Sequence, residues 1–219
     1  MNKQFWTVNS LDQFTAEVYL YGYIGYESTA MASGFVKELR GLEKKYPKID
    51  MRINSNGGSV YEGIAILHAM EECQSEISAY IDGIAASMAG VIFLNAPKRY
   101  MNKYARLMTH KVKAGCHGTA SQLRSAADEV ESLENDLAAV MSQRTKLSLE
   151  DTRAKYITDT DRYLTAEQAK NEGLIDSIYN GSKIDVPTNI ASLDDVYGLY
   201  STTLNASLST NNTKTIVII

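Results

Sequence analysis

Two spacings of apolar residues alternate along the first half of the chain. Three short segments have the apolar content and spacing of strands: 17–24, 49–53 and 77–81. Between the first two, apolar residues recur at every third or fourth position from Met31 to Tyr46, which predicts a helix that ends at Pro47. A second helix is predicted behind Ser59, which together with Glu62 has the form of a capping box. Strands that alternate with helices through short connections indicate an α/β fold with a mainly parallel sheet.

The second half of the chain begins with a run of small residues and continues with a long helix. The small residues from Ala85 to Gly90 open an apolar helix, and a short strand is predicted at 106–109. Apolar residues at helical spacing predict a helix of about 25 residues that starts at Thr119. Because this helix is longer than most, we expect it to pack against another subunit as well as its own domain. Two further helix starts and a final strand follow: Ser148, Thr165 and 174–178.

The start of the first predicted strand at residue 17 and a change of composition near residue 181 divide the chain into three parts. We predict an N-terminal segment at 1–16, one α/β domain at 17–180, and a Ser/Thr/Asn-rich tail or arm at 181–219. A short helix is predicted in the tail near Leu193–Tyr200, and the last residues, Ile216–Ile219, are apolar. A length of 219 residues fits one domain with an appendage.

Charge and cysteine content exclude several classes of protein. The chain has 22 Lys and Arg against 26 Asp and Glu, a net charge of −4, so we expect no nucleic-acid partner. The most apolar stretch, 83–94, is too short to span a bilayer, and residues 1–10 lack the apolar region of a secretory signal. Two cysteines, Cys73 and Cys116, cannot build a disulfide scaffold or a four-cysteine zinc site. We therefore expect a cytoplasmic protein with no membrane partner.

Ser87 is the first candidate for chemistry. It follows a predicted strand, has small neighbours and begins an apolar helix. A nucleophilic serine needs the positive potential of a helix N-terminus and small neighbours that let a substrate backbone approach. The same small residues also suit close packing of the helix, so both interpretations stay open.

Two loops that follow strands offer further candidates. The loop 54–58, Asn-Ser-Asn-Gly-Gly, can present backbone N–H groups to an oxyanion, or it can simply be a turn. His110 ends the strand at 106–109 and enters a glycine-containing loop, where catalytic groups often lie. His68 is interpreted as structural or surface-exposed, and His117 as solvated.

An acidic residue that could orient His110 lies between Asp159 and Tyr163. Asp161 is the first candidate and Asp159 is the competing one, and either side chain can instead satisfy backbone groups in a turn. His, Cys, Asp and Glu do not cluster at the spacings of metal ligands, so we expect no metal and no cofactor.

Taken in chain order, these segments resemble the ClpP-type serine peptidases, the proteolytic subunits of caseinolytic proteases. The resemblance covers roughly residues 16–180. Four segments carry it, and a matching ending follows them: 53–58, 83–89, 107–110, 160–167 and 172–178. The resemblance implies a Ser-His-Asp triad in which Ser87 is the nucleophile, His110 is the base and Asp161 fixes the imidazole tautomer.

The same resemblance implies the surroundings of the triad and the assembly. The family's oxyanion donors map to the backbone N–H groups of Gly58 and Met88, and Gly57 and Gly58 would contact the substrate. The family fold is a spiral of β-β-α units, as in crotonases, and the long helix would be its handle between two rings. A homo-oligomeric ring that encloses the sites and cuts proteins or peptides is therefore expected.

Some features of the chain are similar to the phage and prophage branch of this family, the head maturation proteases. Asn56 stands where the family usually has proline, Lys111-Val112 replaces a usual Gln-Pro, and the tail is additional. This branch implies capsid, scaffold or portal proteins as substrates, usually without an ATPase unfoldase. A Clp subunit that works with an ATPase is the alternative. From other classes, a crotonase-like acyl-CoA enzyme or an inactive structural homologue would share the fold.

Overall fold

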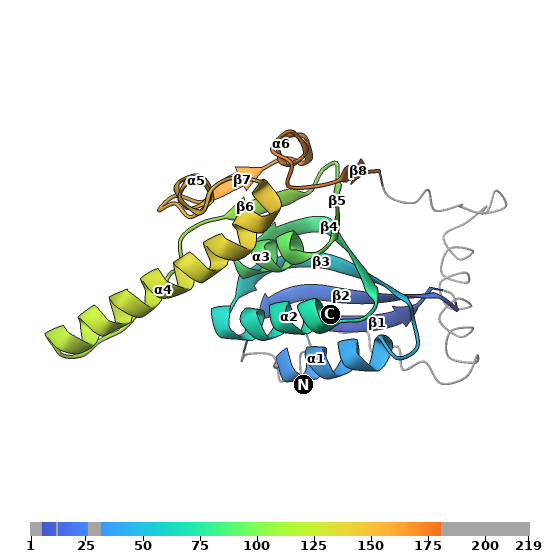
Figure 1. Cartoon of the computed structure of the whole chain (residues 1–219), viewed down its shortest axis with the longest axis horizontal. Helices are drawn as coiled ribbons and strands as arrows, with labels where there is room; N and C mark the ends of the chain where they lie inside the picture. The colour runs from blue at the N-terminus through green and yellow to red at the C-terminus, as the bar shows by residue number, and fades with distance from the viewer. Residues whose placement is uncertain (1–5, 12, 26–31, 181–219) are drawn as a thin grey trace, which may run out of the picture.

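A mostly parallel sheet organises the fold, and helices pack against it (Figure 1). The computed structural model describes residues 6–11, 13–25 and 32–180. Within these residues the strands are β1 (Trp6–Ser10), β2 (Thr15–Ile24), β3 (Lys48–Gly58), β4 (Glu76–Ala86), β5 (Lys98–Asn102), β6 (Arg106–Thr109), β7 (Arg162–Leu164) and β8 (Ser177–Tyr179). The helices are α1 (Ala32–Leu42), α2 (Val60–Glu72), α3 (Met88–Asn95), α4 (Ala120–Thr145), α5 (Leu149–Tyr156) and α6 (Ala166–Asn171). The predicted tail and the helix predicted within it lie outside the described residues.

The strands follow the order β1-β2-β3-β4-β5-β8 across the sheet, and β1 runs antiparallel to β2 while the other neighbours are parallel. The long strand β4 has two partners on one side. β5 pairs with its first half, at Ser78–Ile81, and β6 pairs with its second half, at Ile84–Ala86. β7 then pairs antiparallel with β6. This arrangement brings the ends of β4 and β6 and the start of β7 to one place.

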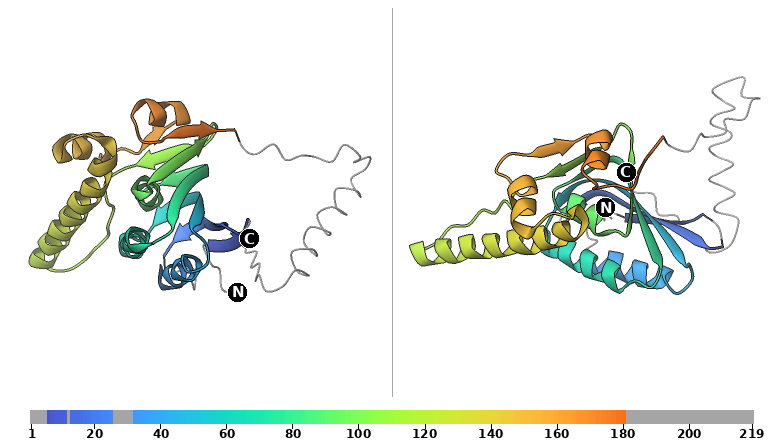
Figure 2. Two further views of the ribbon diagram at one scale, coloured as in Figure 1. Left: turned by 45° about the vertical axis from the view of Figure 1, so that its right-hand side comes forward. Right: turned by 45° about the horizontal axis from the view of Figure 1, so that its top comes forward.

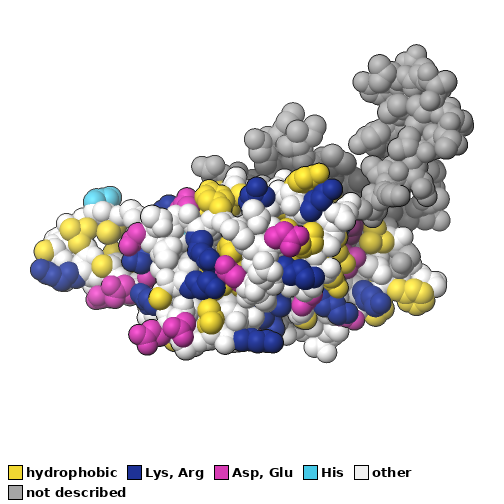
Figure 3. Space-filling model, turned by 90° about the horizontal axis from the view of Figure 1, so that it is seen from above, with side chains coloured by type: hydrophobic (Ala, Val, Ile, Leu, Met, Phe, Trp, Pro, Cys, Tyr) yellow, Lys and Arg dark blue, Asp and Glu magenta, His cyan; other side chains and the backbone are white. Residues whose placement is uncertain are grey.

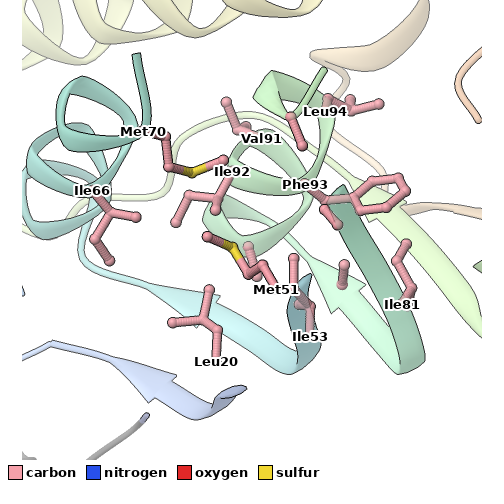
Figure 4. Packing of buried hydrophobic residues seen from close by; sticks show 14 of the residues in the cluster. Leu20, Met51, Ile53, Ile66, Met70, Ile81, Val91, Ile92, Phe93 and Leu94 are labelled. Atoms are coloured by element: carbon pink, nitrogen blue, oxygen red, sulfur yellow. The ribbon is translucent and has the colours of Figure 1, made fainter. Parts of the chain in front are cut away.

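The core lies between the sheet and the helices α1, α2 and α3, which cover one face of it (Figure 2). Alternate residues of β2 and β3 are fully buried, and Figure 4 shows Leu20, Met51 and Ile53 facing the side chains of α2 and α3. Every residue of α3 is buried, because this helix lies among β3, β4, α2 and α4. α3 therefore has little freedom to move, and a residue at its first turn is held firmly by the core.

α4 is long and only partly packed on the rest of the chain. It begins at Thr119, whose side chain forms a complete capping box with Gln122, and it runs for 26 residues. Leu133, Leu137 and Met141 are buried on its C-terminal half. The N-terminal half projects beyond the body in Figure 1, with residues 120–125 exposed.

The structure confirms the predicted α/β class and the starts of three helices at Thr119, Ser148 and Thr165. The apolar pattern predicts none of the strands β1, β5 and β7, each of which has five residues or fewer. Because β1 pairs with β2, the sheet begins before residue 17, within the predicted N-terminal segment.

Four local predictions are wrong. Residues 54–58, predicted as a loop or turn, continue β3 to Gly58 and pair with β2. α1 ends at Leu42 and not at Pro47, because the chain tightens into a turn there, in which Lys45 N donates to Leu42 O three residues back. The last strand starts at Ser177 rather than 174, since Leu174 N donates back to the end of α6. At the start of α2, Ser59 Oγ does accept from Glu62 N. The Glu62 carboxylate instead accepts from Ala32 N, so the predicted capping box is only half formed.

Charged side chains of both signs are interspersed on the face of the molecule that Figure 3 shows. In the part of the chain that the structure describes, no helix combines the length and apolar character needed to cross a membrane.

Candidate active site

Ser87 forms the sharp turn between β4 and α3. Its φ of 55° and ψ of −127° are rare for a residue with a side chain, and such a conformation costs about 1–3 kcal/mol. The surrounding structure holds the turn: Ser87 N donates to Met108 O at 2.9 Å, and Gly90 N donates to Ser87 O at 2.9 Å. The Ser87 side chain does not cap α3, so its hydroxyl is available to another partner.

That partner is His110, which directly follows β6. The parallel pairing of β4 with β6 sets Ala86 beside Met108, so the residues after these strands are neighbours. His110 Nε2 lies 2.8 Å from Ser87 Oγ, a hydrogen-bond distance. Only 13% of the His110 side chain is exposed. The imidazole is therefore placed to accept the serine proton, and most of its own surface is shielded from water.

Asp161 directly precedes β7 and reaches the other side of His110. The antiparallel register of β6 and β7 pairs Thr109 with Arg162, which sets Asp161 near the imidazole. Asp161 Oδ1 lies 3.3 Å from His110 Nδ1, but the N–H does not point at the oxygen closely enough to make a hydrogen bond. The same Oδ1 accepts a hydrogen bond from Lys113 Nζ at 3.2 Å.

Asp159, the competing candidate, takes no such position. Its carboxylate pairs with Lys111 Nζ at 3.1 Å, and 86% of its side chain is exposed. The structure thus brings together Ser87, His110 and Asp161, and it leaves Asp159 at the surface.

Burial and the nearby Lys113 ammonium act on the pKa of His110 in the same direction. Burial lowers the pKa of His110 below its ordinary value of 6.5, and the Lys113 ammonium lowers it further. The nearby Asp161 carboxylate raises the pKa, but by less. His110 is therefore neutral, and able to accept a proton, at neutral pH.

Gly57 and Gly58 end β3, where Gly57 lies against the turn at the serine and Gly58 lies against β2. Both have positive φ, +87° and +149°. A Cβ on Gly57 would lie 2.5 Å from Ala86 O and 2.9 Å from Met88 N, and one on Gly58 would lie 2.0 Å from a carbonyl oxygen of β2. Only glycine permits this approach. Met88 is the first residue of α3, so its N–H has no partner within the helix. The segments that carry the two predicted oxyanion donors are thus in contact next to the serine.

A pocket of about 250 Å³ opens beside the serine. Polar residues line part of it: Asn56 near the end of β3, Thr109 at the end of β6, and Lys113 in the loop that follows. The helices and the segment after α5 supply apolar walls: Val60, Met88, Val91, Leu137, Met141 and Ile157. Such a pocket suits an apolar side chain whose backbone reaches the serine hydroxyl.

Sequence reasoning missed Lys113 and the part that α4 plays in the pocket. Lys113 lies in a loop without periodicity, and only its approach to Asp161 distinguishes it. Leu137 belongs to the apolar stripe of α4, so its pattern indicates the core and not a pocket wall. His68 and His117 are exposed, as expected. The described residues hold no group of three or more His, Cys, Asp or Glu side chains that could bind a metal.

Known proteins that are similar to this chain are proteolytic subunits of Clp proteases. The family model described as Clp protease matches residues 9–182. ATP-dependent Clp protease proteolytic subunit 1 of Prochlorococcus marinus subsp. pastoris is 35% identical over 161 residues, 71% of this chain and 81% of that protein. Proteolytic subunit 2 of Synechococcus sp. strain CC9605 is 34% identical over 151 residues, 67% of this chain and 76% of that protein. Proteolytic subunit 2 of Corynebacterium efficiens is 36% identical over 132 residues, 59% of this chain and 65% of that protein.

Proposed function

The chain belongs to the Clp protease family, and from that premise we propose that it is a serine endopeptidase whose triad is Ser87, His110 and Asp161. One observation carries the proposal: the 2.8 Å contact between Ser87 Oγ and His110 Nε2, made from a strained turn at the N-terminus of a buried helix. The peptidase domain spans 17–180, with β1 added to its sheet, and the tail spans 181–219.

The proposed reaction begins when His110 Nε2 takes the proton of the Ser87 hydroxyl as its oxygen attacks the scissile carbonyl. The carbonyl oxygen becomes negatively charged and is stabilised by the backbone N–H groups of Gly58 and Met88. His110 then gives the proton to the leaving amine, and the acyl group stays on Ser87 until water releases it. Asp161 stabilises the imidazolium that forms between these steps. No metal or cofactor takes part in the scheme.

A homo-oligomeric ring is the assembly that we propose, since the relatives are named as proteolytic subunits. The projecting half of α4 supports this assembly. It extends away from its own domain and leaves the apolar residue Leu123 43% exposed, where another subunit could cover it. Because the relatives are also named as ATP-dependent, an ATPase unfoldase is a candidate partner. We propose the cytoplasm as the location of this activity.

The finer role that we propose is maturation of a phage or prophage head, with capsid, scaffold or portal protein as the substrate. Asn56 and the pair Lys111-Val112 support it, because they depart from the sequence typical of the ATP-dependent subunits. A proteolytic subunit that works with an ATPase is the competing role, and the names of the relatives favour it. Cleavage of a co-expressed capsid protein without any ATPase would support the first role. Cleavage of casein only when an ATPase and ATP are added would support the second.

Two functions of other classes make different predictions. A crotonase-like acyl-CoA enzyme would bind acyl-CoA, which isothermal titration would detect, and we expect no binding. An inactive structural homologue would cleave neither casein nor capsid protein.

Labelling by a fluorophosphonate tests the proposed nucleophile. We expect the wild-type protein to be labelled at Ser87, and Ser87→Ala to lose both the label and about a thousandfold or more of peptidase turnover. Ser125→Ala, an exposed serine on the projecting half of α4, is the matched control and should label like the wild type. Labelling that persists in Ser87→Ala would rule the mechanism out.

A further inference from the structure

One carboxylate oxygen in the site is contacted by two cationic or protonated groups. Asp161 Oδ1 lies 3.3 Å from His110 Nδ1 and 3.2 Å from Lys113 Nζ. Only the lysine contact is a hydrogen bond. In a working triad, the acidic residue accepts a hydrogen bond from Nδ1–H, which orients the imidazole and stabilises its protonated form. In this structure the Asp161 oxygen nearest to Nδ1 accepts a hydrogen bond from Lys113 Nζ instead.

The imidazole shows the effect of that competition. His110 Nδ1 is buried and makes no hydrogen bond within the part of the chain that the structure describes. A buried N–H without a partner costs free energy, so it marks a place where a better contact is available. A small movement of Asp161 Oδ1 into line with the Nδ1–H bond would form this hydrogen bond, because Oδ1 and Nδ1 are already 3.3 Å apart.

Among the groups around His110, Lys113 is the cation that contacts Asp161. Lys111, two residues earlier on the same loop, pairs with Asp159 and not with Asp161. From β2, Tyr23 reaches the pocket, and the walls from α3 and α4 are apolar. Asp161 itself is 38% exposed and Lys113 is 66% exposed, so solvent and ligands can reach their contact.

We propose that Lys113 is a positioning residue that holds Asp161 off His110 and keeps the triad in a resting arrangement. The inference rests on the proposed function, and it concerns the regulation of that same site. Any group that draws the Lys113 ammonium away, such as a carboxylate of a bound peptide, frees Oδ1 to accept from Nδ1–H. The triad then becomes aligned, and the imidazole becomes a stronger base.

The direction of the pH effect follows from the charges. Lys113 lowers the pKa of His110, and Asp161 raises it. Removing the Lys113 ammonium therefore removes one cause that lowers the pKa of His110. It also strengthens the effect of Asp161, which raises that pKa. Lys113→Gln should move the protonation midpoint of His110 to higher pH, whereas a purely structural role for Lys113 would leave the midpoint unchanged.

Hydrogen–deuterium exchange at the histidine C2 position, followed by mass spectrometry across pH, measures this midpoint without requiring activity. We expect the His110 midpoint to rise in Lys113→Gln and to stay at the wild-type value in Lys113→Arg, which keeps the charge. Lys111→Gln is the matched control, since it removes the same charge from the same loop, and it should leave the His110 midpoint unchanged. His68 and His117 serve as internal references in every variant. A His110 midpoint that is unchanged or lower in Lys113→Gln overturns the proposal.

The rate of fluorophosphonate labelling gives the second measurement. Above the midpoint, Lys113→Gln should label about three- to tenfold faster than the wild type, because the aligned imidazole is a stronger base. Slower labelling of Lys113→Gln would mean that the lysine assists the reaction, which also overturns the proposal. If the wild type is not labelled at all, the proposed function fails, and the exchange experiment still decides whether Lys113 controls His110.

Discussion

Arg162 donates two hydrogen bonds to Glu172, one to each carboxylate oxygen, at 3.1 and 2.8 Å. The buried Tyr156 hydroxyl donates to the same carboxylate at 2.6 Å, and Lys155 Nζ lies 3.2 Å from it. Arg162 is the first residue of β7 and directly follows Asp161. This cluster of Tyr156, Lys155, Arg162 and Glu172 therefore holds the backbone next to Asp161, the proposed triad carboxylate.

Glu172→Gln should weaken that support. We expect the free energy of unfolding to fall by about 1–3 kcal/mol, because three charged or hydroxyl donors lose an ionised acceptor. Peptidase kcat should fall as well, since β7 holds Asp161. Urea denaturation and peptide hydrolysis measure the two effects. Glu167→Gln, an exposed residue on α6, is the control and should change the unfolding free energy by less than about 0.5 kcal/mol. Equal losses in both variants would contradict the assignment.

The same cluster predicts a dependence of stability on pH. Burial alone would raise the pKa of Glu172, but hydrogen bonds from Arg162, Tyr156 and Lys155 outweigh it and lower the pKa from 4.5 to about 2. Because the folded pKa lies below the unfolded one, the stabilisation is fully present above pH 4.5 and is lost as the pH falls toward 2. Urea denaturation across this range should show the difference between wild type and Glu172→Gln shrink. A difference that stays constant down to pH 2 would refute the linkage.

The strained turn at Ser87 separates stability from activity. Ser87→Gly and Ser87→Ala should both abolish turnover, but glycine adopts the observed φ of 55° without the steric cost that alanine has. We expect Ser87→Gly to be more stable than Ser87→Ala by about 1 kcal/mol. Chemical denaturation of the two variants measures this directly, and an equal or lower stability of Ser87→Gly would show that the turn is not strained.

Gly57→Ala should remove activity through a steric effect. Its Cβ would meet Ala86 O at 2.5 Å and force the end of β3 away from the serine turn. We expect labelling by fluorophosphonate to slow about a hundredfold or more, as expected when oxyanion donors are displaced. Gly41→Ala is the control, because a Cβ added at Gly41 would meet no atom within 4 Å. Normal labelling of Gly57→Ala would mean that the end of β3 does not form part of the site.

The candidate residues could be found from the sequence because each one lies at the end or the start of a strand. Ser87 follows β4, His110 follows β6, and Asp161 precedes β7, so local patterns mark all three. Their closeness comes from pairing between distant segments, and β7 has only three residues, too few for a periodic signal. Their catalytic roles stay a prediction.

The contact between Lys113 and Asp161 could not be predicted in the same way. It joins residues that are 48 positions apart, and exposed lysines carry no signal of their partners. The positive φ of Ser87 has no local signal either, since serine is not a residue that favours it. Tertiary packing imposes both features.

α4 is one uninterrupted helix of 26 residues, about 39 Å long, with Leu137 and Met141 in the pocket wall and its first turns outside the body. The helix is anchored in the body of the protein from about Leu133 onward, where its side chains become buried. Continuous hydrogen-bonded backbone, and no loop, connects the outer half of α4 to the residues of the pocket wall. The exposed outer half of α4 and part of the pocket wall therefore belong to one continuous helix.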